Sequence, residues 1–206
     1  MLALIDYGMG NLSSVKKAFI ASGAGDIEII NEPSRLTDAD ALILPGVGNF
    51  GDGIKSLEKA GFAEAIINDV AKGKPLIGIC LGMQLLMETS EEAPNSKGLG
   101  IFKGKSIRFS DDMNLKVPHI GWNSVAFKRP NKFTDNLIDN EYFYFVHSYY
   151  VEPEDHSIII GTTDYGIKFC SCIGKDNVFA TQFHPEKSQD AGLNMIKNFI
   201  DNIKKR

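Results

Sequence analysis

In the first half of the chain, short apolar runs alternate with stretches of helical periodicity. The runs at residues 2–5, 27–30, 41–44 and 76–79 are almost entirely apolar, and polar or glycine-rich segments bound each of them. Runs of this length are typical of strands that are buried on both faces. The pattern therefore predicts four strands of a mainly parallel sheet.

Between these strands, apolar residues recur at the spacing of an amphipathic helix. Residues 12–22 carry such a stripe and stop at Gly23, and residues 62–72 carry another that stops at Gly73 and Pro75. Glycine and proline after the last apolar position are typical helix ends. The resulting order, β-α-β-β-α-β-α, predicts a flavodoxin-like α/β fold: a doubly wound sheet in three layers, with helices on both faces.

From residue 106 onwards the pattern changes to short strands separated by turns. We expect these strands to be antiparallel or mixed, and to extend the same sheet or form a smaller one. A polar loop is predicted at 91–98, and an amphipathic helix closes the chain at 190–204. Neither a repeat nor a linker divides the sequence, so we expect one domain over residues 1–206. The predicted strands are residues 106–109, 124–127, 142–146, 158–162, 167–173 and 178–182.

Composition and charge argue against several classes of function. The 206 residues are 43% hydrophobic and 23% charged, and the formal net charge of −4 gives no sign of a nucleic-acid-binding surface. No apolar stretch is long enough to cross a membrane, and residues 1–6 lack the basic region of a signal peptide. Three cysteines, an odd number, do not suit a disulfide framework, which favours a cytoplasmic location.

Cofactor and metal signals are weak. The segment Gly8-x-Gly10-x-x-Ser13 only partly matches a dinucleotide-binding fingerprint, because serine replaces the third glycine. Strict alternation places the thiols of Cys170 and Cys172 on one face of a strand, with no second Cys or His pair nearby. Structural zinc sites usually need four ligands. We therefore expect neither a metal nor another cofactor.

The remaining cysteine, Cys80, lies between a predicted apolar strand and a predicted helix, whose first turns are expected at 83–87. Gly78 and Gly82 flank Cys80 at two residues on either side. This is the pattern of a nucleophile elbow, a turn so sharp that a Cβ at either flanking position would collide with neighbouring backbone. The amino end of a helix also favours thiolate over thiol. A cysteine in a strand is usually a small buried hydrophobe, but the two glycines favour catalysis.

A glycine-rich segment at 45–53 follows the third predicted strand. It lacks the Gly-Lys-Ser/Thr ending of a P-loop. We expect a mobile loop, with glycines at positions 46, 48, 51 and 53, whose backbone N–H groups face an anion. Beside Cys80 that anion would be the tetrahedral oxyanion of an acyl transfer. The alternative is an ordinary loop that caps the next helix.

A histidine and a carboxylate follow the last predicted strand. Residues two apart in an extended segment point to one side, so His184 and Glu186 can pair. The imidazole would take the proton of the Cys80 thiol, and the carboxylate would fix the tautomer of the ring. His147 is a competing base, but no carboxylate lies at a fixed spacing from it. We interpret its strand end as lining for a bound substrate.

These motifs resemble those of a known family. Gly78-Ile79-Cys80-Leu81-Gly82-Met83-Gln84 and Phe183-His184-Pro185-Glu186 are similar to the motifs of class I (triad) glutamine amidotransferases, and Pro45-Gly46-Val47-Gly48 fits their oxyanion strand. Within that class the chain resembles the glutaminase subunits of imidazole glycerol phosphate synthases, of histidine biosynthesis. The closer match rests on Asp6-Tyr7-Gly8-Met9-Gly10-Asn11, Pro118-His119-Ile120-Gly121-Trp122-Asn123 and His184-Pro185-Glu186-Lys187-Ser188.

The resemblance implies a glutaminase whose catalytic triad is Cys80, His184 and Glu186. It implies an ammonia transfer inside a heterodimer, to a cyclase subunit with a (β/α)₈ barrel that makes imidazole glycerol phosphate and AICAR from PRFAR. The residues that it assigns to the oxyanion hole are Gly46, Val47, Gly48 and Leu81. Those that it assigns to the substrate L-glutamine are Gln84, His147, Ser148 and Tyr149.

A partner surface is also implied. Trp122 is the only tryptophan and lies in a predicted Gly-Trp-Asn turn; its alternative role is a core aromatic. The family favours an interface, as does the frequency of tryptophan at binding hot spots. Lys187, beside the triad, would be a charge that faces the partner. The residues assigned to this surface are Asn11, Pro118, His119, Gly121, Trp122, Asn123 and Lys187.

Two other functions stay open. A paralogous subunit could feed ammonia to a related synthase of another pathway, such as amidination of a surface sugar, because the triad is indifferent to where ammonia goes. A different class would be a stand-alone thiol hydrolase, or a redox or chaperone module on the same fold. Gln84, the oxyanion segment and the residues around Trp122 speak against this second alternative.

Overall fold

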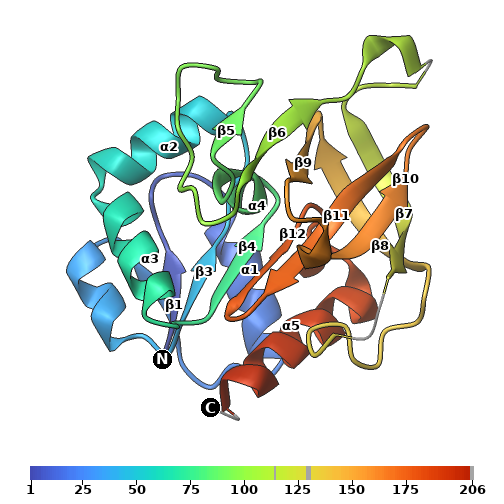
Figure 1. Cartoon of the computed structure of the whole chain (residues 1–206). Coiled ribbons are helices and arrows are strands. Elements are labelled where there is room, and N and C mark those ends of the chain that lie inside the picture. The colour runs from blue at the N-terminus through green and yellow to red at the C-terminus, as the bar shows by residue number, and fades with distance from the viewer. Residues whose placement is uncertain (114, 129–130, 205–206) are drawn as a thin grey trace.

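The computed structural model describes residues 1–113, 115–128 and 131–204, and its centre is a mixed sheet (Figure 1). In the half ordered β2-β1-β3-β4-β12, all neighbouring strands are parallel. Four of these strands, β1, β3, β4 and β12, are buried along their whole length, as expected for strands that are covered on both faces. The bounds are β1 Leu2–Ile5, β2 Ile27–Ile30, β3 Ala41–Leu44, β4 Leu76–Ile79 and β12 Val178–Thr181.

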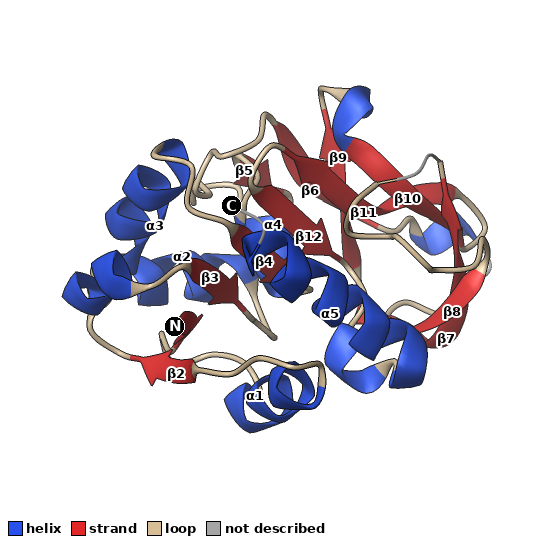
Figure 2. Cartoon of the chain, turned by 90° about the horizontal axis from the view of Figure 1, so that it is seen from below, coloured by secondary structure: helices blue, strands red, loops and turns tan. Residues whose placement is uncertain are grey.

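Helices cover both faces of this parallel half, which confirms the predicted α/β fold (Figure 2). On one face, Phe50 and Phe62 of α2 and α3 share a hydrophobic core with Leu44. On the other face, Phe19 of α1 and Phe199 of α5 meet edge to face, with ring centroids 6.4 Å apart. The bounds are α1 Leu12–Ala21, α2 Phe50–Lys59, α3 Phe62–Ala71 and α5 Gln189–Lys204.

Antiparallel strands extend the sheet beyond β12, as predicted, in the order β11-β10-β7-β8. Strand β7 is longer than expected and begins at His119, so Trp122 lies within a strand and not in a turn. Strands β5 and β9, which were not predicted, pair with β6. The bounds are β5 Thr89–Ser90, β6 Gly104–Arg108, β7 His119–Phe127, β8 Glu141–His147, β9 Tyr149–Pro153, β10 Ile159–Asp164 and β11 Lys168–Lys175.

The predicted mobile loop at 45–53 is wrong in its second part, because α2 begins at Phe50. The Asn49 side chain caps this helix by accepting a hydrogen bond from the Asp52 N–H, at 3.2 Å. Its two glycines serve close packing: a Cβ on Gly51 or Gly53 would press against neighbouring side chains. Glycine is therefore needed at these two positions because it is small, and not because the backbone there is flexible.

Two further expectations need correction. Helix α4 spans Leu81–Leu85, so it begins directly after the elbow and is only five residues long. Cys170 and Cys172 belong to different hydrophobic cores on opposite faces of the sheet. The reason is a break in the register between β10 and β11, which interrupts the strict alternation of side chains at Ser171.

Candidate active site

The site forms where the parallel neighbours β3, β4 and β12 end at the same edge of the sheet. The oxyanion segment at 45–48 follows β3, Cys80 follows β4, and His184 lies shortly after β12. Thr181 pairs with Ile79, so the last residues of β4 and β12 are level. Because reactive groups of doubly wound sheets gather at the carboxyl ends of strands, this edge is the expected place for chemistry.

The elbow has the geometry that its glycines predict. Cys80 adopts φ 53° and ψ −108°, a conformation that is rare for a residue with a side chain. Its N–H donates a 2.7 Å hydrogen bond to the Thr181 carbonyl oxygen, which ties the turn to β12. A Cβ on Gly82 would overlap the carbonyl oxygen of Leu44, and a Cβ on Gly78 would lie 3.0 Å from the Gly82 oxygen. The sharp turn therefore depends on both glycines.

The predicted histidine–carboxylate pair is present. Nδ1 of His184 lies 2.8 Å from Oε1 of Glu186, and both side chains are almost completely buried. The backbone of His184 is held on both sides: its N–H donates to the Tyr144 carbonyl oxygen at 2.9 Å, and its own carbonyl oxygen accepts from the Ser188 hydroxyl. The second ring nitrogen, Nε2, is buried and makes no hydrogen bond within the described residues. It is therefore free to exchange a proton with the thiol or a substrate.

The electrostatics link Cys80 to this pair. Burial alone lowers the pKa of His184, but its interactions with Cys80 and Glu186 outweigh burial and raise the pKa above the usual range of histidine. Burial, together with the charge of Cys80, also raises the pKa of Tyr7, whose hydroxyl donates to the Pro45 carbonyl oxygen at 2.7 Å. This arrangement places the Cys80 thiol beside an imidazole of raised pKa, which is the pairing that activates a cysteine nucleophile.

A cavity of about 420 Å³ opens above the thiol. Its size suits a small polar substrate, because ligand cavities commonly occupy a few hundred Å³. Gly46, which was predicted for the oxyanion hole, does not line the cavity; a Cβ there would be 2.5 Å from the Tyr7 hydroxyl oxygen and 3.0 Å from the Leu81 Cβ. The other predicted residues of the oxyanion hole and the substrate site all line the cavity with Cys80, namely Val47, Gly48, Leu81, Gln84, His147, Ser148 and Tyr149.

His147 is excluded as the base by its hydrogen bonds. Its Nδ1 lies 2.8 Å from the Tyr149 carbonyl oxygen, which can only accept, so this nitrogen carries the proton. Its Nε2 then accepts from Nδ1 of His119, at 3.0 Å. In turn, Nε2 of His119 lies 3.2 Å from the amide nitrogen of Asn123. Both nitrogens of each ring are thus occupied while the rings are neutral.

Burial keeps this histidine pair neutral. It lowers the pKa of His147 to about 3, an effect that the neighbouring His119 reinforces, and it lowers the pKa of His119 to about 4. His119 stacks on Phe145 and Tyr165, with ring centroids 4.8 and 4.0 Å away. This histidine pair supports the strand end that lines the cavity.

Gln182 is a site residue that the sequence analysis missed. Its side chain is completely buried, and its amide nitrogen lies 3.7 Å from the Cys80 sulfur. Its amide oxygen accepts a hydrogen bond from Nε2 of Gln84, at 3.1 Å. The available signal was its position two residues before His184, which puts it at the same strand end.

The expected partner residues fall into two groups. Trp122 is 46% exposed, which rules out the core alternative, and its ring meets Tyr144 edge to face at 6.2 Å. Lys187 lies 5.7 Å above the same Tyr144 ring. By contrast, His119 is only 3% exposed and lies behind the surface. Lys187 also borders the cavity, as does Pro118. Of the remaining residues, Asn11 caps α1 through the Ser14 N–H, and Gly121 and Asn123 lie on β7.

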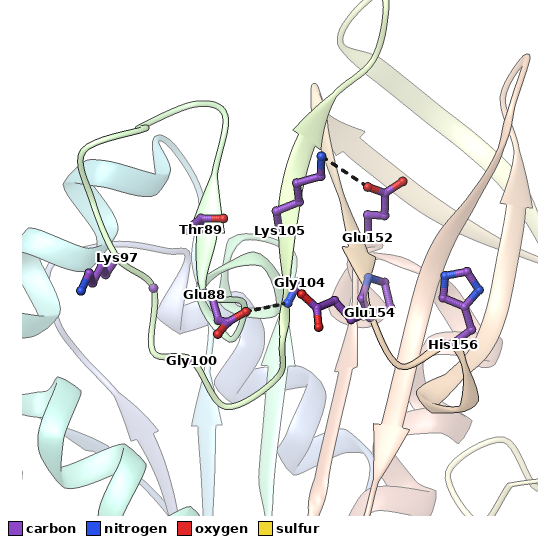
Figure 3. Close-up of a pocket in the computed structure, with 11 residues that line it drawn as sticks. Glu88, Thr89, Lys97, Gly100, Gly104, Lys105, Glu152, Glu154 and His156 are labelled. Carbon is purple, nitrogen blue, oxygen red and sulfur yellow. Dashed lines mark hydrogen bonds and ion pairs between the residues drawn. The ribbon is translucent and has the colours of Figure 1, made fainter.

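A second, larger cavity lies away from the triad (Figure 3). It has a volume of about 740 Å³ and is lined mainly by charged and glycine residues between β5, β6 and β9. Two of its carboxylates already have partners: Glu152 pairs with Lys105 at 3.6 Å, and Glu88 accepts from the Gly104 N–H at 3.1 Å. No triad residue lines it. The described residues also contain no cluster of His, Cys, Asp or Glu suited to a metal ion.

Comparison with known proteins identifies the family of the chain. The family model "Glutamine amidotransferase class-I" matches residues 3–203. The chain belongs to the class I glutamine amidotransferases. Solved structures show the same fold: a glutamine amidotransferase and a PurLQS structure from Thermotoga maritima each align with a TM-score of 0.76, at 17% and 18% identity, and each comparison covers at least 97% of both chains.

Relatives of higher sequence identity indicate which group within this class the chain belongs to. The chain is 49% identical to the "Imidazole glycerol phosphate synthase subunit HisH" of Syntrophotalea carbinolica, over 98% of this chain and all of the relative. It is 49% identical to the protein of that name from Aquifex aeolicus, over 95% of this chain and 94% of the relative. Within its class the chain therefore belongs with the HisH subunits. None of the helices in the described residues is long and apolar enough to span a membrane.

Proposed function

We propose that this chain is the glutaminase subunit of an imidazole glycerol phosphate synthase, and that it works in a cytoplasmic heterodimer with a cyclase subunit. The single observation that carries the glutaminase assignment is the elbow thiol beside the buried His184–Glu186 pair, at the base of a cavity. Membership among the HisH subunits supports the choice of pathway.

In the proposed reaction, the Cys80 thiolate attacks the side-chain amide carbon of glutamine and forms a tetrahedral oxyanion. The backbone N–H groups of Val47, Gly48 and Leu81 would stabilise the negative oxygen, since these residues line the cavity around the thiol. The protonated ring of His184 gives its proton to the leaving nitrogen, and ammonia departs. Water then attacks the glutamyl thioester, His184 takes a proton from that water, and glutamate and the thiolate are released.

The proposed exit for ammonia lies toward the cyclase. Ammonia protonates in water and is then no longer a nucleophile, so it has to be shielded on its way to the acceptor. A face of β7 and β8 beside the cavity exposes large apolar side chains, including Ile120 (59%), Trp122 (46%) and Tyr142 (59%). Such a patch suits a protein partner. We propose that this face, with Lys187, docks on the barrel of the cyclase.

The test separates ammonia production from its use. In the complex, Cys80→Ala should abolish synthesis driven by glutamine but leave synthesis driven by added ammonium intact. Cys170→Ala is the matched control, because Cys170 is also buried but lies away from the cavity, and it should retain both activities. Loss of both activities in Cys80→Ala would contradict the proposed division of labour.

The acceptor can be tested separately. Mixing the wild-type chain with the histidine-pathway cyclase and with a paralogous synthase should give ammonia transfer only with the former. Transfer only to the paralogous acceptor would place the chain in another pathway and would leave the glutaminase assignment untouched.

A further inference from the structure

Gln182 is in contact with the nucleophile but is not a member of the triad. It follows the last residue of β12 and precedes His184 by two positions. Its side chain has no exposed surface, and a buried amide is costly unless its donors and acceptor are paired. Both ends of this amide meet residues of the site, so the cost of burying it is offset within the site itself.

One end of the amide faces the sulfur. The side-chain nitrogen of Gln182 donates to the Cys80 sulfur at 3.7 Å, within the range of N–H···S contacts. The sulfur also lies 3.9 Å from the Val146 carbonyl oxygen, to which only a protonated thiol can donate. These two neighbours have opposite effects: the carbonyl favours the thiol, whereas the amide favours the thiolate.

The other end fixes Gln84. The amide nitrogen of Gln84 has two hydrogens: one is donated to the Gln182 oxygen at 3.1 Å, and the other to the Tyr149 carbonyl oxygen at 3.0 Å. The same Tyr149 oxygen accepts from Nδ1 of His147. Since both donors of Gln84 are used, its side-chain oxygen is the only polar atom left for a ligand in the cavity. Gln84 is thereby set to accept a hydrogen bond.

We infer that Gln182 is a further residue of the catalytic machinery with two roles. Its N–H stabilises the Cys80 thiolate, and its oxygen holds Gln84 so that the Gln84 oxygen faces an N–H donor of the substrate. The second role rests on the proposed glutaminase function, whereas the first depends only on the contact with sulfur.

Two measurements test these roles independently. The first is the pH profile of Cys80 alkylation by iodoacetamide, which follows the thiolate and needs no glutamine. The second is the KM for glutamine of the heterodimer. Gln182→Met removes both polar atoms at similar volume, so its alkylation midpoint should rise by about one pH unit, a tenfold change in thiolate content at a pH below both midpoints. Its KM should rise several-fold.

Two other variants separate the roles from a loss of structure. Gln84→Met keeps the Gln182–sulfur contact, so it should raise KM and leave the alkylation midpoint unchanged. Thr163→Val removes a different buried hydrogen bond, the 3.0 Å contact with Ser171 on neighbouring strands, and should change neither quantity.

The outcomes are distinct. A wild-type alkylation midpoint in Gln182→Met would overturn the thiolate role, and a wild-type KM would overturn the role in holding Gln84. An equal midpoint shift in Thr163→Val would mean that the Gln182 result reflects general loosening, and this too would overturn the inference. If the wild-type heterodimer does not hydrolyse glutamine, the proposed function fails, while the alkylation profiles still decide the first role.

Discussion

The buried histidine pair should make the fold sensitive to mild acid. His147 and His119 are neutral in the folded protein, because burial lowers the pKa of His147 to about 3 and that of His119 to about 4. In the unfolded chain both rings regain an ordinary pKa near 6.5. Below pH 6.5 the unfolded state therefore binds more protons than the folded state, and the free energy of unfolding must fall as the pH decreases.

The size of the effect follows from the difference in pKa. At pH 5, the pH lies 1.5 units below the pKa of 6.5 that His147 has in the unfolded chain, so the ring is protonated there but neutral in the folded chain. This difference lowers the free energy of unfolding by about 2 kcal/mol. His119 adds a loss of the same sign. Protonation would also break the hydrogen bonds of the pair, because the Nε2 of His147 could no longer accept.

Urea unfolding followed by circular dichroism at pH 7 and pH 5 measures this loss. His147→Gln removes the titrating group but keeps an amide donor, so its stability should depend less on pH than that of the wild type, by about 2 kcal/mol over this interval. The exposed His156 provides the control, and His156→Gln should behave as the wild type does. If wild type and His147→Gln lose equal stability between pH 7 and pH 5, the ring is not held neutral and the reasoning is refuted.

Three further outcomes are expected. Gly82→Ala should destabilise the fold by about 3 kcal/mol in urea titrations, because its Cβ would overlap the Leu44 carbonyl oxygen. Gly25→Ala is the control and should be tolerated, because a Cβ there meets open space; equal stability of the two variants would contradict the steric account of the elbow. Glu186→Gln should lower the kcat of glutamine hydrolysis by a factor on the order of 10² to 10⁴, with Glu152→Gln unchanged, and an undiminished rate would remove Glu186 from the triad. Trp122→Ala should weaken cyclase binding by about 2 kcal/mol in calorimetry, whereas Ile138→Ala, which is 72% exposed, should not; equal affinities would argue against the docking face.

Local sequence patterns were enough to predict the parallel half of the fold, the sharp turn at Cys80 and the hydrogen bond between His184 and Glu186. Runs such as 41–44 and 76–79 are buried on both faces, so their composition alone identifies them. The two glycines of the elbow indicate a position where a Cβ would collide with neighbouring backbone. The two-residue spacing of His184 and Glu186 is sufficient for a hydrogen bond between their side chains. In each case the determining interaction lies within a few residues or within a regular sheet.

What the sequence did not predict depends on contacts between distant residues. The role of Gln182 arises from Cys80 and Gln84, which lie about a hundred positions earlier in the chain. Gly51 and Gly53 resemble loop residues in the sequence, because most of their packing partners are on other segments of the chain. A break in the register at Ser171 has no signal in an alternating pattern, and it moved Cys170 and Cys172 to opposite faces.

The proposed reaction requires that the sulfur of Cys80 form the bond with the side-chain amide carbon of glutamine. This can be measured by intact-mass and peptide mass spectrometry of the heterodimer after exposure to a glutamine analogue with an electrophilic side-chain carbon. We predict a single adduct on Cys80, suppressed by excess L-glutamine and absent from Cys80→Ser. Modification of the buried Cys170 or Cys172 with Cys80 left unlabelled, or labelling of Cys80 that glutamine does not suppress, would contradict it.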